Sequence, residues 1–220
     1  SNWFEADSGY SLLINSTEGG YALIEADYYP LTILGWFKID HKNGDVTLFT
    51  DENLHLGVSD TRRPFAVYQG TQWYSEDRIS WDVWFHLAFL RHDEAGFYEF
   101  ILNGEPAQTC KGPYSSRSKC PDASNTVAFD STISDGFLIV GNYEGPLQSR
   151  VSNSTYNINI DNLQLFDERL DVSEVQGFAQ NGTMACDPTN GALMRCFDFD
   201  DTLSGTAGEV AFDSSLYRKD

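Results

Sequence analysis

Residues 135–179 read DGFLIVGNYEGPLQSRVSNSTYNINIDNLQLFDERLDVSEVQGFA, and this stretch decides the fold of the chain. It begins with an apolar segment that ends in glycine and continues through a polar loop. A segment with alternating apolar residues and a short helical pattern follow. Alternation with a period of two predicts a strand with one buried face. The order of these elements predicts the closing half of a two-sheet β-sandwich.

The segments before this stretch follow the same plan of short strands and turns. Residues 83–91 alternate cleanly, and residues 97–102 return as their hairpin partner. Residues 71–82 are rich in aromatic and acidic side chains and predict a loop. Strands at this spacing, with turn residues between them, favour an all-β sandwich. Residues 31–40, LTILGWFKID, predict a strand with Ile33, Gly35, Phe37 and Ile39 on one face and Leu34, Trp36 and Lys38 on the other.

A single helix is expected, at residues 171–180. Asp171 is placed to cap its first turn, and Glu174, three residues on, completes the capping-box pattern. The predicted fold class is therefore an all-β, two-sheet antiparallel jelly roll with one short helix.

The overall charge limits the classes of partner. The chain has 14 basic and 33 acidic residues, a formal net charge of −19. Such a field repels phosphate backbones and anionic lipid, which argues against nucleic acid and membrane surfaces as partners. No run approaches the roughly 18 apolar residues that span a bilayer, so membrane insertion is not expected either. The many carboxylates leave room for a divalent cation, calcium above all.

The four cysteines form two local pairs, Cys110 with Cys120 and Cys186 with Cys196, each around turn-forming residues. Four cysteines allow three pairings, and we favour the local one. Each local bridge would close about ten residues and stabilise the fold by roughly 2–3 kcal/mol. A zinc site would require closer spacing with histidine nearby.

Three Asn-x-Ser/Thr sequons stand at Asn15, Asn153 and Asn181. Asn153 and Asn181 fall in predicted loops, where a glycan could be attached. The chain begins with Ser1 rather than Met, and we expect a mature or excised piece from which a signal peptide has been removed. Paired cysteines and sequons together predict a secreted, extracellular glycoprotein.

In order along the chain, these segments resemble the laminin-G-like, concanavalin-A-like jelly-roll family, which is related to the pentraxins. LTILGWFKID resembles the family's early core strand, and WDVWFHLAFLRHDEAGFYEFILNGE resembles its hairpin. FLIVGNYEG and INIDNLQLFDERLDVSEVQGF resemble its penultimate strand, its last long strand and its final helix. The resemblance covers residues 8–179.

The chain departs from the family's order at its end. A strand of the type LMRCFDFDD, followed by Gly and Asp-Ser-Ser, normally comes first in the family, and here it comes last, at residues 193–215. We therefore expect residues 1–180 to form the sandwich and residues 181–220 to supply a disulfide loop and a completing strand. Either the strand fills the first position in its own molecule, as in a circular permutant, or it joins a neighbouring subunit head to tail.

No catalytic constellation stands out. The family's glucanase relatives carry Glu-x-Asp-x-x-Glu on one strand, and the nearest match here, Glu25 and Asp27, meets Pro30 at the third position. The four histidines are scattered, and no Ser–His–Asp spacing suggests a nucleophile. His86 alternates with apolar neighbours, which predicts a strand residue with satisfied hydrogen bonds. We expect no enzyme.

The resemblance implies a calcium site. Many laminin-G-like modules hold one cation between loops, with oxygen ligands from several strands. Asp161 matches the family's acidic position on the last long strand, and Asp198 and Asp200 lie on the displaced strand that should neighbour it. The alternative is that these are ordinary acids of turns and edges.

Carbohydrate-binding relatives also use exposed aromatic rings. In the predicted loop, Trp73 and Tyr74 are the candidates for stacking on a sugar, whereas Trp36, Trp81 and Trp84 are expected to be structural.

Three functions follow, in order of preference. The first is a secreted, non-enzymatic glycoprotein module in extracellular assembly or adhesion, which could form a filament or matrix through head-to-tail exchange of its last strand. The second is a calcium-dependent, lectin-like carbohydrate-binding module. The third is a degenerate glycoside hydrolase.

Overall fold

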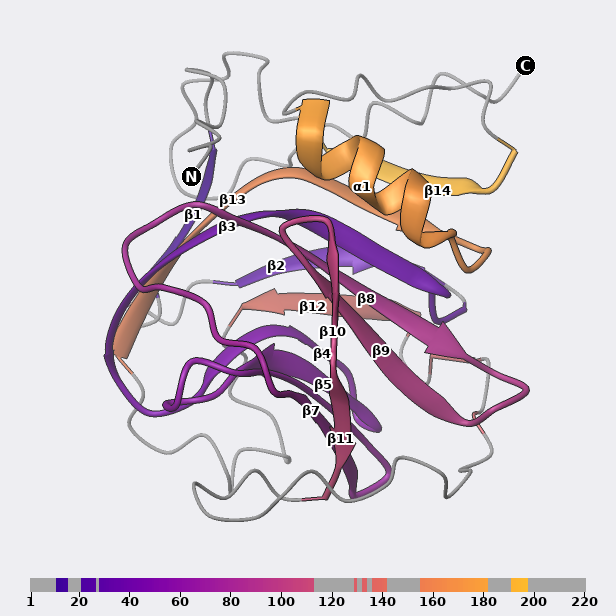
Figure 1. Cartoon of the computed structure of the whole chain (residues 1–220), viewed down its shortest axis with the longest axis horizontal. Helices are drawn as coiled ribbons and strands as arrows, with labels where there is room; N and C mark the ends of the chain where they lie inside the picture. The colour runs from indigo at the N-terminus through magenta and orange to yellow at the C-terminus, as the bar shows by residue number, and fades with distance from the viewer. Residues whose placement is uncertain are drawn as a thin grey trace.

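Two antiparallel β-sheets stacked face to face make up the body of the protein, with one helix on the outside (Figure 1). The computed structural model describes residues 11–15, 21–26, 28–112, 129, 132–133, 136–141, 155–181 and 191–197. Within these residues the predicted all-β jelly-roll class is confirmed. The division of the chain at residue 180 stays a prediction.

The sheet that carries the helix, here called the helix-side sheet, has the strand order β1-β13-β3-β8-β9-β10, with β14 also paired to β13. Its members are β1 (Leu12–Asn15), β3 (Thr32–Asn43), β8 (Phe85–His92), β9 (Phe97–Leu102), β10 (Glu105–Ala107), β13 (Thr155–Phe166) and β14 (Leu193–Phe197).

The second sheet, here called the opposite sheet, has the order β11-β7-β6-β5-β4-β12-β2. Its members are β2 (Tyr21–Glu25), β4 (Val46–Thr50), β5 (Leu54–Val58), β6 (Pro64–Tyr68), β7 (Thr71–Ser75), β11 (Thr109–Lys111) and β12 (Phe137–Gly141). The expected loop at 71–82 is therefore wrong in its first part, because residues 71–75 pair as a strand with both β6 and β11.

The core lies between the two sheets and follows the alternation of the sequence. On β3, Ile33, Phe37 and Ile39 point inward, as predicted, and all three are buried in the main apolar cluster. Phe37 meets Phe49 of the opposite sheet edge to face, with ring centroids 6.2 Å apart. Burial of each such side chain contributes roughly 1.5–3 kcal/mol, so alternation alone specifies which face of each strand is buried.

The one helix of the described residues, α1 (Val172–Asn181), covers part of the outer face of the helix-side sheet (Figure 1). The backbone N–H of Asp171 donates to the Glu174 carboxylate at 2.7 Å, which confirms the predicted capping interaction. Beneath the helix, outward residues of the sheet form a second apolar cluster with Val175. The sheet residues in this cluster are Leu34, Ala88, Leu90, Ile101, Phe166, Leu193 and Cys196.

The displaced last strand, β14, pairs with β13 of the same chain. Its partners are Leu163 to Phe166, whereas β1 pairs with Asn157 to Ile160 of the same strand. Both strands run antiparallel to β13, so β14 and β1 follow one another in the same direction along one edge. Asp161 and Asn162 lie between the two paired stretches. This is the arrangement expected if the first strand of an ordinary sandwich were divided between the two ends of the chain.

Candidate functional site

Asp161, the predicted calcium ligand on β13, lies on the outer face of the helix-side sheet. It is 4% exposed and opposes Trp36 of β3. The register between β13 and β3 shifts just after it, and Asn162 has a positive φ of 49°. The neighbouring β14 ends at Phe197, which pairs with Leu163. The displaced strand therefore reaches the neighbourhood of Asp161, as the sequence predicts.

The other two predicted ligands, Asp198 and Asp200, lie outside the described residues. Within the described part of the chain, no three His, Cys, Asp or Glu side chains gather closely enough to hold a metal ion. The calcium site therefore stays a prediction. Nor is any described helix both long and apolar enough to cross a membrane.

Trp73 does not offer an exposed ring for a sugar. It lies on β7, points into the core and is 0% exposed. Its ring centroid is 5.7 Å from that of Tyr98 and 6.0 Å from that of Phe129. The prediction of an exposed loop aromatic is wrong here because residues 71–75 form a strand, and the inward positions of that strand fill the sandwich.

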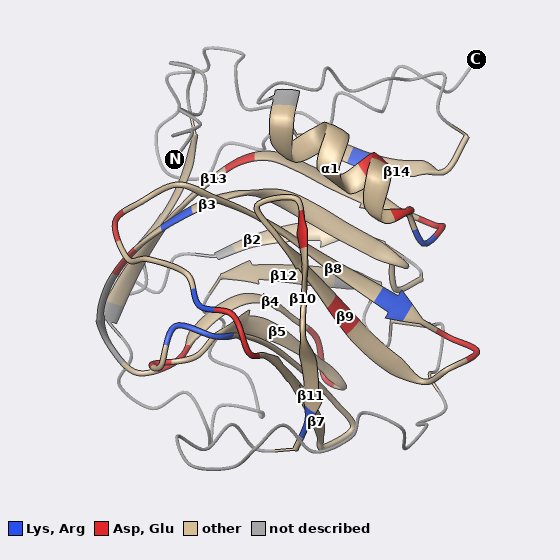
Figure 2. Cartoon of the chain, viewed as in Figure 1, with Lys and Arg blue, Asp and Glu red and all other residues tan. Residues whose placement is uncertain are grey.

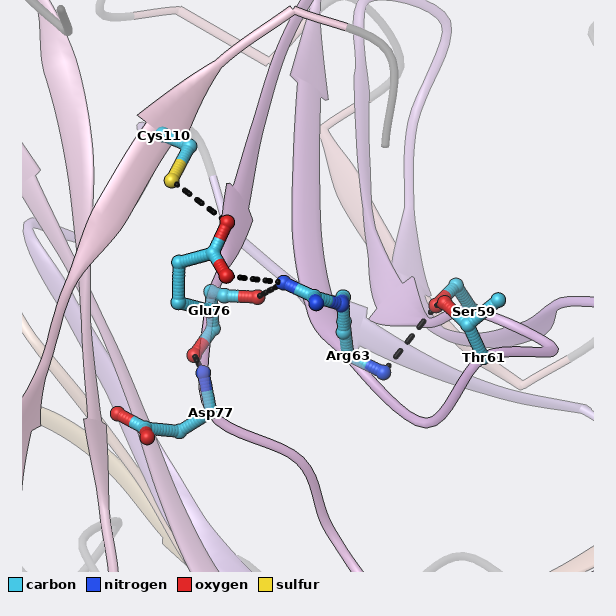
Figure 3. A network of polar contacts seen from close by, with 7 residues as sticks. Ser59, Thr61, Arg63, Glu76, Asp77 and Cys110 are labelled. Atoms are coloured by element: carbon cyan, nitrogen blue, oxygen red, sulfur yellow. Dashed lines mark hydrogen bonds and ion pairs between the residues drawn. The ribbon is translucent and has the colours of Figure 1, made fainter. Parts of the chain in front are cut away.

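Tyr74 points to the other side of β7 but is buried as well, at 1% exposure. A polar network lies beside it, where β6 begins and β7 ends (Figure 3). Arg63 pairs with Glu76 at 3.0 Å, and its guanidinium carbon lies 5.7 Å from the centre of the Tyr74 ring. The prediction of exposure is therefore wrong for Tyr74 too.

The same network links two loops of the opposite sheet. The backbone N–H of Arg63 donates to Ser59 Oγ at 3.1 Å, and Ser59 Oγ contacts Thr61 Oγ1 at 2.8 Å (Figure 3). Cys110 Sγ lies 3.3 Å from Glu76 Oε1. Because Arg63 and Glu76 neutralise one another and their contacts are made within the chain, we assign the network a structural role.

The predicted disulfides and sequons lie partly outside the described residues. Cys110 and Cys196 are not free thiols, and they belong to different apolar clusters. Cys120 and Cys186 fall outside the described residues, so the local pairing stays a prediction. Asn15 ends β1, and Asn153 lies outside the described residues. Asn181 ends α1 instead of lying in a loop.

His86 occupies an outward position on β8, next to Trp36. The two rings meet edge to face with centroids 5.5 Å apart. The side chain is 1% exposed, and neither ring nitrogen has a hydrogen-bond partner among the described residues. Burial lowers the pKa of His86 from 6.5 to about 3, because a charged imidazolium would lose its hydration there. The expected strand position is confirmed, but the expected hydrogen-bonding partners are not found.

Beyond Trp36 and His86, towards the C-terminal end of β3, the outer face becomes polar and more accessible. We call this area the polar platform: Lys38 and Asp40 on β3, Asn157 and Asn159 on β13, and Trp84, which immediately precedes β8. All five are partly exposed. The two amides, the carboxylate and the ammonium group can form hydrogen bonds with a ligand. The indole can stack on a ring of the ligand.

No sequence motif marks the polar platform. Trp84 was expected to be structural, yet it is partly exposed and belongs to no buried cluster of the described residues. The signal that could have identified the platform is the alternation itself, because residues 38, 40, 157 and 159 all occupy outward positions. Figure 2 shows charged residues in turns and also within strands of this sheet, and Lys38 and Asp40 both belong to β3.

No model of a known protein family matches the chain, and no curated protein matches it in sequence. Similar solved structures exist. A Bacteroides ovatus protein inferred to bind carbohydrate matches 94% of this chain and 55% of its own, with 13% identity and a TM-score of 0.64. The binding domain of botulinum neurotoxin serotype C1 matches 81% of this chain and 45% of its own, with 11% identity and a TM-score of 0.54.

A third similar structure is an enzyme. Trypanosoma rangeli sialidase in complex with 2,3-difluorosialic acid matches 84% of this chain and 29% of its own, with 15% identity and a TM-score of 0.52. The chain thus spans about half of the first structure and less of the other two. At these identities the similarity concerns the fold alone, and the fold is a jelly-roll sandwich.

Proposed function

We propose that this chain is a lectin-like carbohydrate-binding module that acts by binding rather than by catalysis. The observation that carries the proposal is the similarity of the sandwich, over 94% of its length, to a structure inferred to bind carbohydrate. The polar platform adds a surface of suitable chemistry. Carbohydrate binding therefore takes precedence over the assembly role that the sequence ranked first.

We place this module in a secreted glycoprotein of laminin-G-like type. The support is the sequence: the order of its strand motifs, its two local cysteine pairs and its sequons. Mass spectrometry of protein from a secreting eukaryotic host would test both features. We expect glycan on Asn153 and peptides linked through Cys110–Cys120 and Cys186–Cys196. Free thiols and unmodified asparagines would contradict this placement.

The direct test is a glycan microarray probed with the whole purified chain. We expect a restricted set of glycans to bind, and we expect each of these to raise the melting temperature in solution, because a ligand that binds only the folded state stabilises it. If no glycan on a broad array binds, and none shifts the melting temperature at millimolar concentration, the proposal is wrong.

Calcium forms a separate part of the proposal. Asp161, Asp198 and Asp200 would supply hard oxygen ligands between β13 and the end of β14, as the resemblance implies. Titration calorimetry with calcium chloride would show heat that Asp161→Asn removes. An absence of heat and of thermal stabilisation in the wild-type chain would exclude the site while leaving carbohydrate binding untouched.

Head-to-tail assembly remains a second candidate because of one observation. β14 and β1 lie end to end on β13, so a β14 strand from another copy would fit the same half-edge. Light scattering of the full chain, and of a chain that lacks residues 192–220, would decide. We expect concentration-dependent polymers that disappear on truncation. A full chain that stays monomeric at every concentration would exclude assembly.

A further inference from the structure

We propose that the polar platform is a binding site for a neutral glycan, with the indole of Trp84 stacking on one pyranose ring. The inference rests on the proposed carbohydrate-binding function and locates it on the helix-side sheet, on the same face as α1. It replaces Trp73 and Tyr74, which are buried, with a tryptophan that is partly exposed.

Strand register places the platform residues side by side. Lys38 opposes Asn159, and Asn159 opposes Leu13 of β1. Phe37 opposes Phe85, so Trp84 and Lys38, each one residue beyond this pair, are also neighbours. The result is a row across four adjacent segments of one sheet, Trp84–Lys38–Asn159–Leu13. Neighbouring strands are about 4.8 Å apart, so the row is long enough for two or more sugar rings.

A second row, Asp40 and Asn157, lies beside the first. Asn157 Nδ2 donates to Asp40 Oδ2 at 3.3 Å. Ser11 Oγ donates to Asn159 Oδ1 at 3.5 Å. These bonds use one polar atom of each amide and fix its orientation. The other amide atom of each, together with Asp40 Oδ1 and the Lys38 ammonium group, supplies the alternating donors and acceptors that vicinal sugar hydroxyls require.

The charge of the platform favours a neutral ligand. Lys38 and Asp40 cancel, so the platform has no net charge on a chain whose formal net charge is −19. A phosphate or sulfate ligand would need several cations, and Lys38 is the only one in either row. A divalent cation would need several carboxylates, and Asp40 is the only one. A neutral polyhydroxyl ligand matches this balance of groups.

The small apolar content of the platform argues against a protein partner. The centre of a protein interface is usually rich in aromatic and aliphatic side chains and poor in charged ones. Here Leu13, 59% exposed, and Trp84 are the apolar members of the two rows, at opposite ends of the first. One aromatic ring beside several hydrogen-bonding groups suits a sugar, which has an apolar face and a polar rim.

The test compares matched variants of the whole chain on a microarray of neutral and anionic glycans. The best ligand is then titrated by calorimetry and by tryptophan fluorescence. We expect a neutral glycan as best ligand. Trp84→Ala should weaken its binding roughly tenfold or more, and Asn159→Ala several-fold. Trp84→Phe should retain most of the affinity but lose the ligand-dependent fluorescence change.

The control is Leu23→Ala. Leu23 is 52% exposed on β2 of the opposite sheet, so it matches Leu13 in type and exposure but lies away from the platform. Leu23→Ala should leave affinity unchanged. Melting curves identify any variant that fails to fold. If Trp84→Ala fails to fold, Asn159→Ala decides through its effect on affinity, and Trp84→Phe decides through the loss of the ligand-dependent fluorescence change. Both are milder changes, because Asn159 is partly exposed and phenylalanine keeps an aromatic ring at residue 84.

The outcomes separate the location from the function. Wild-type binding that Trp84→Ala and Asn159→Ala weaken, and Leu23→Ala does not, supports the platform. Wild-type binding that none of these variants changes overturns the platform and leaves the carbohydrate-binding function intact. A preference for sulfated or phosphorylated glycans overturns the neutral-ligand inference. A chain that binds no glycan, or binds only protein, overturns both proposals.

Discussion

The outer face of the helix-side sheet has two halves that share the same strands but differ in chemistry. Under α1, the outward residues are apolar and buried, as in Leu34, Leu90 and Phe166. Further along the same strands they are polar and partly exposed, as in Lys38 and Asn159. The inward faces of both halves are mainly apolar, with Arg91 of β8 as a buried charged exception. Among the described residues the change is confined to the outer face, which indicates that its polar half serves contacts other than core packing.

The change is gradual along each strand and crosses one intermediate row. On β3 the outward residues run Leu34, Trp36, Lys38. On β8 the outward residues from the covered end are Ala88 and His86, and Trp84 follows at the position just before the strand. Trp36 and His86 form the intermediate row, buried yet no longer purely apolar. Its position between the helix and the platform is consistent with the burial of the His86 imidazole. The two halves therefore predict different responses to mutation.

The largest effect is expected in the covered half. Phe166, 1% exposed, packs beneath α1, and truncation to alanine should lower the free energy of unfolding by about 3–5 kcal/mol through lost burial and a cavity. Phe178, a partly buried helix residue 5.8 Å away between ring centroids, should lose clearly less on the same change. Urea unfolding measures both. Equal losses for the two variants would mean that the depth of burial does not determine the loss of stability at this interface.

The intermediate row predicts a gain. His86→Phe should raise the free energy of unfolding by roughly 1–3 kcal/mol, because two buried nitrogens without partners are replaced by apolar atoms of similar shape. Trp36 would keep an aromatic neighbour. Urea unfolding at pH 7 measures the change. A loss of more than 1 kcal/mol in the free energy of unfolding would indicate that the imidazole makes hydrogen bonds that phenylalanine cannot replace.

The same residue predicts a pH dependence. In the folded state the pKa of His86 is lowered to about 3, whereas in the unfolded state it is near 6.5. Between these values the unfolded state binds the additional proton. The stability is therefore fully present above about pH 6.5 and is lost progressively as the pH falls towards 3. In His86→Phe this part of the acid sensitivity should vanish. Parallel pH profiles for the two proteins would contradict it.

A smaller effect concerns the N-terminal cap of α1, which covers this half of the sheet. The Glu174 carboxylate accepts a hydrogen bond from the Asp171 backbone at 2.7 Å. Glu174→Ala should lower the free energy of unfolding by about 0.5–1 kcal/mol. Gln180→Ala, an exposed change in the last turn, is the control and should be nearly neutral. Thermal unfolding by circular dichroism measures both. A Glu174 loss no greater than the control would exclude the capping contribution.

The sequence predicted the architecture well because alternation and turn residues are local signals. The two faces of β3, the β8–β9 hairpin and the capped helix all follow from spacing within one segment. The sequence could not show that residues 71–75 form a strand, since their pairing with β6 and β11 is a contact between distant segments. That error misplaced the aromatic candidates. An outward tryptophan is exposed or buried according to what covers the sheet, and alternation carries no information about that.

The smallest effect on stability is expected where the proposed effect on binding is large. Asn159 is partly exposed on the polar platform and receives one long contact, from Ser11 at 3.5 Å. Asn159→Ala should therefore change the free energy of unfolding by no more than about 0.5 kcal/mol. If the substitution leaves the free energy of unfolding unchanged but lowers the affinity for the glycan several-fold, the side chain contacts the ligand directly and does not act through the fold. Urea unfolding and calorimetric titration of one preparation give both numbers. A loss above 1.5 kcal/mol in the free energy of unfolding would show that Asn159 is structural. The covered and polar halves of the outer face would then differ in polarity, but both would serve to stabilise the fold.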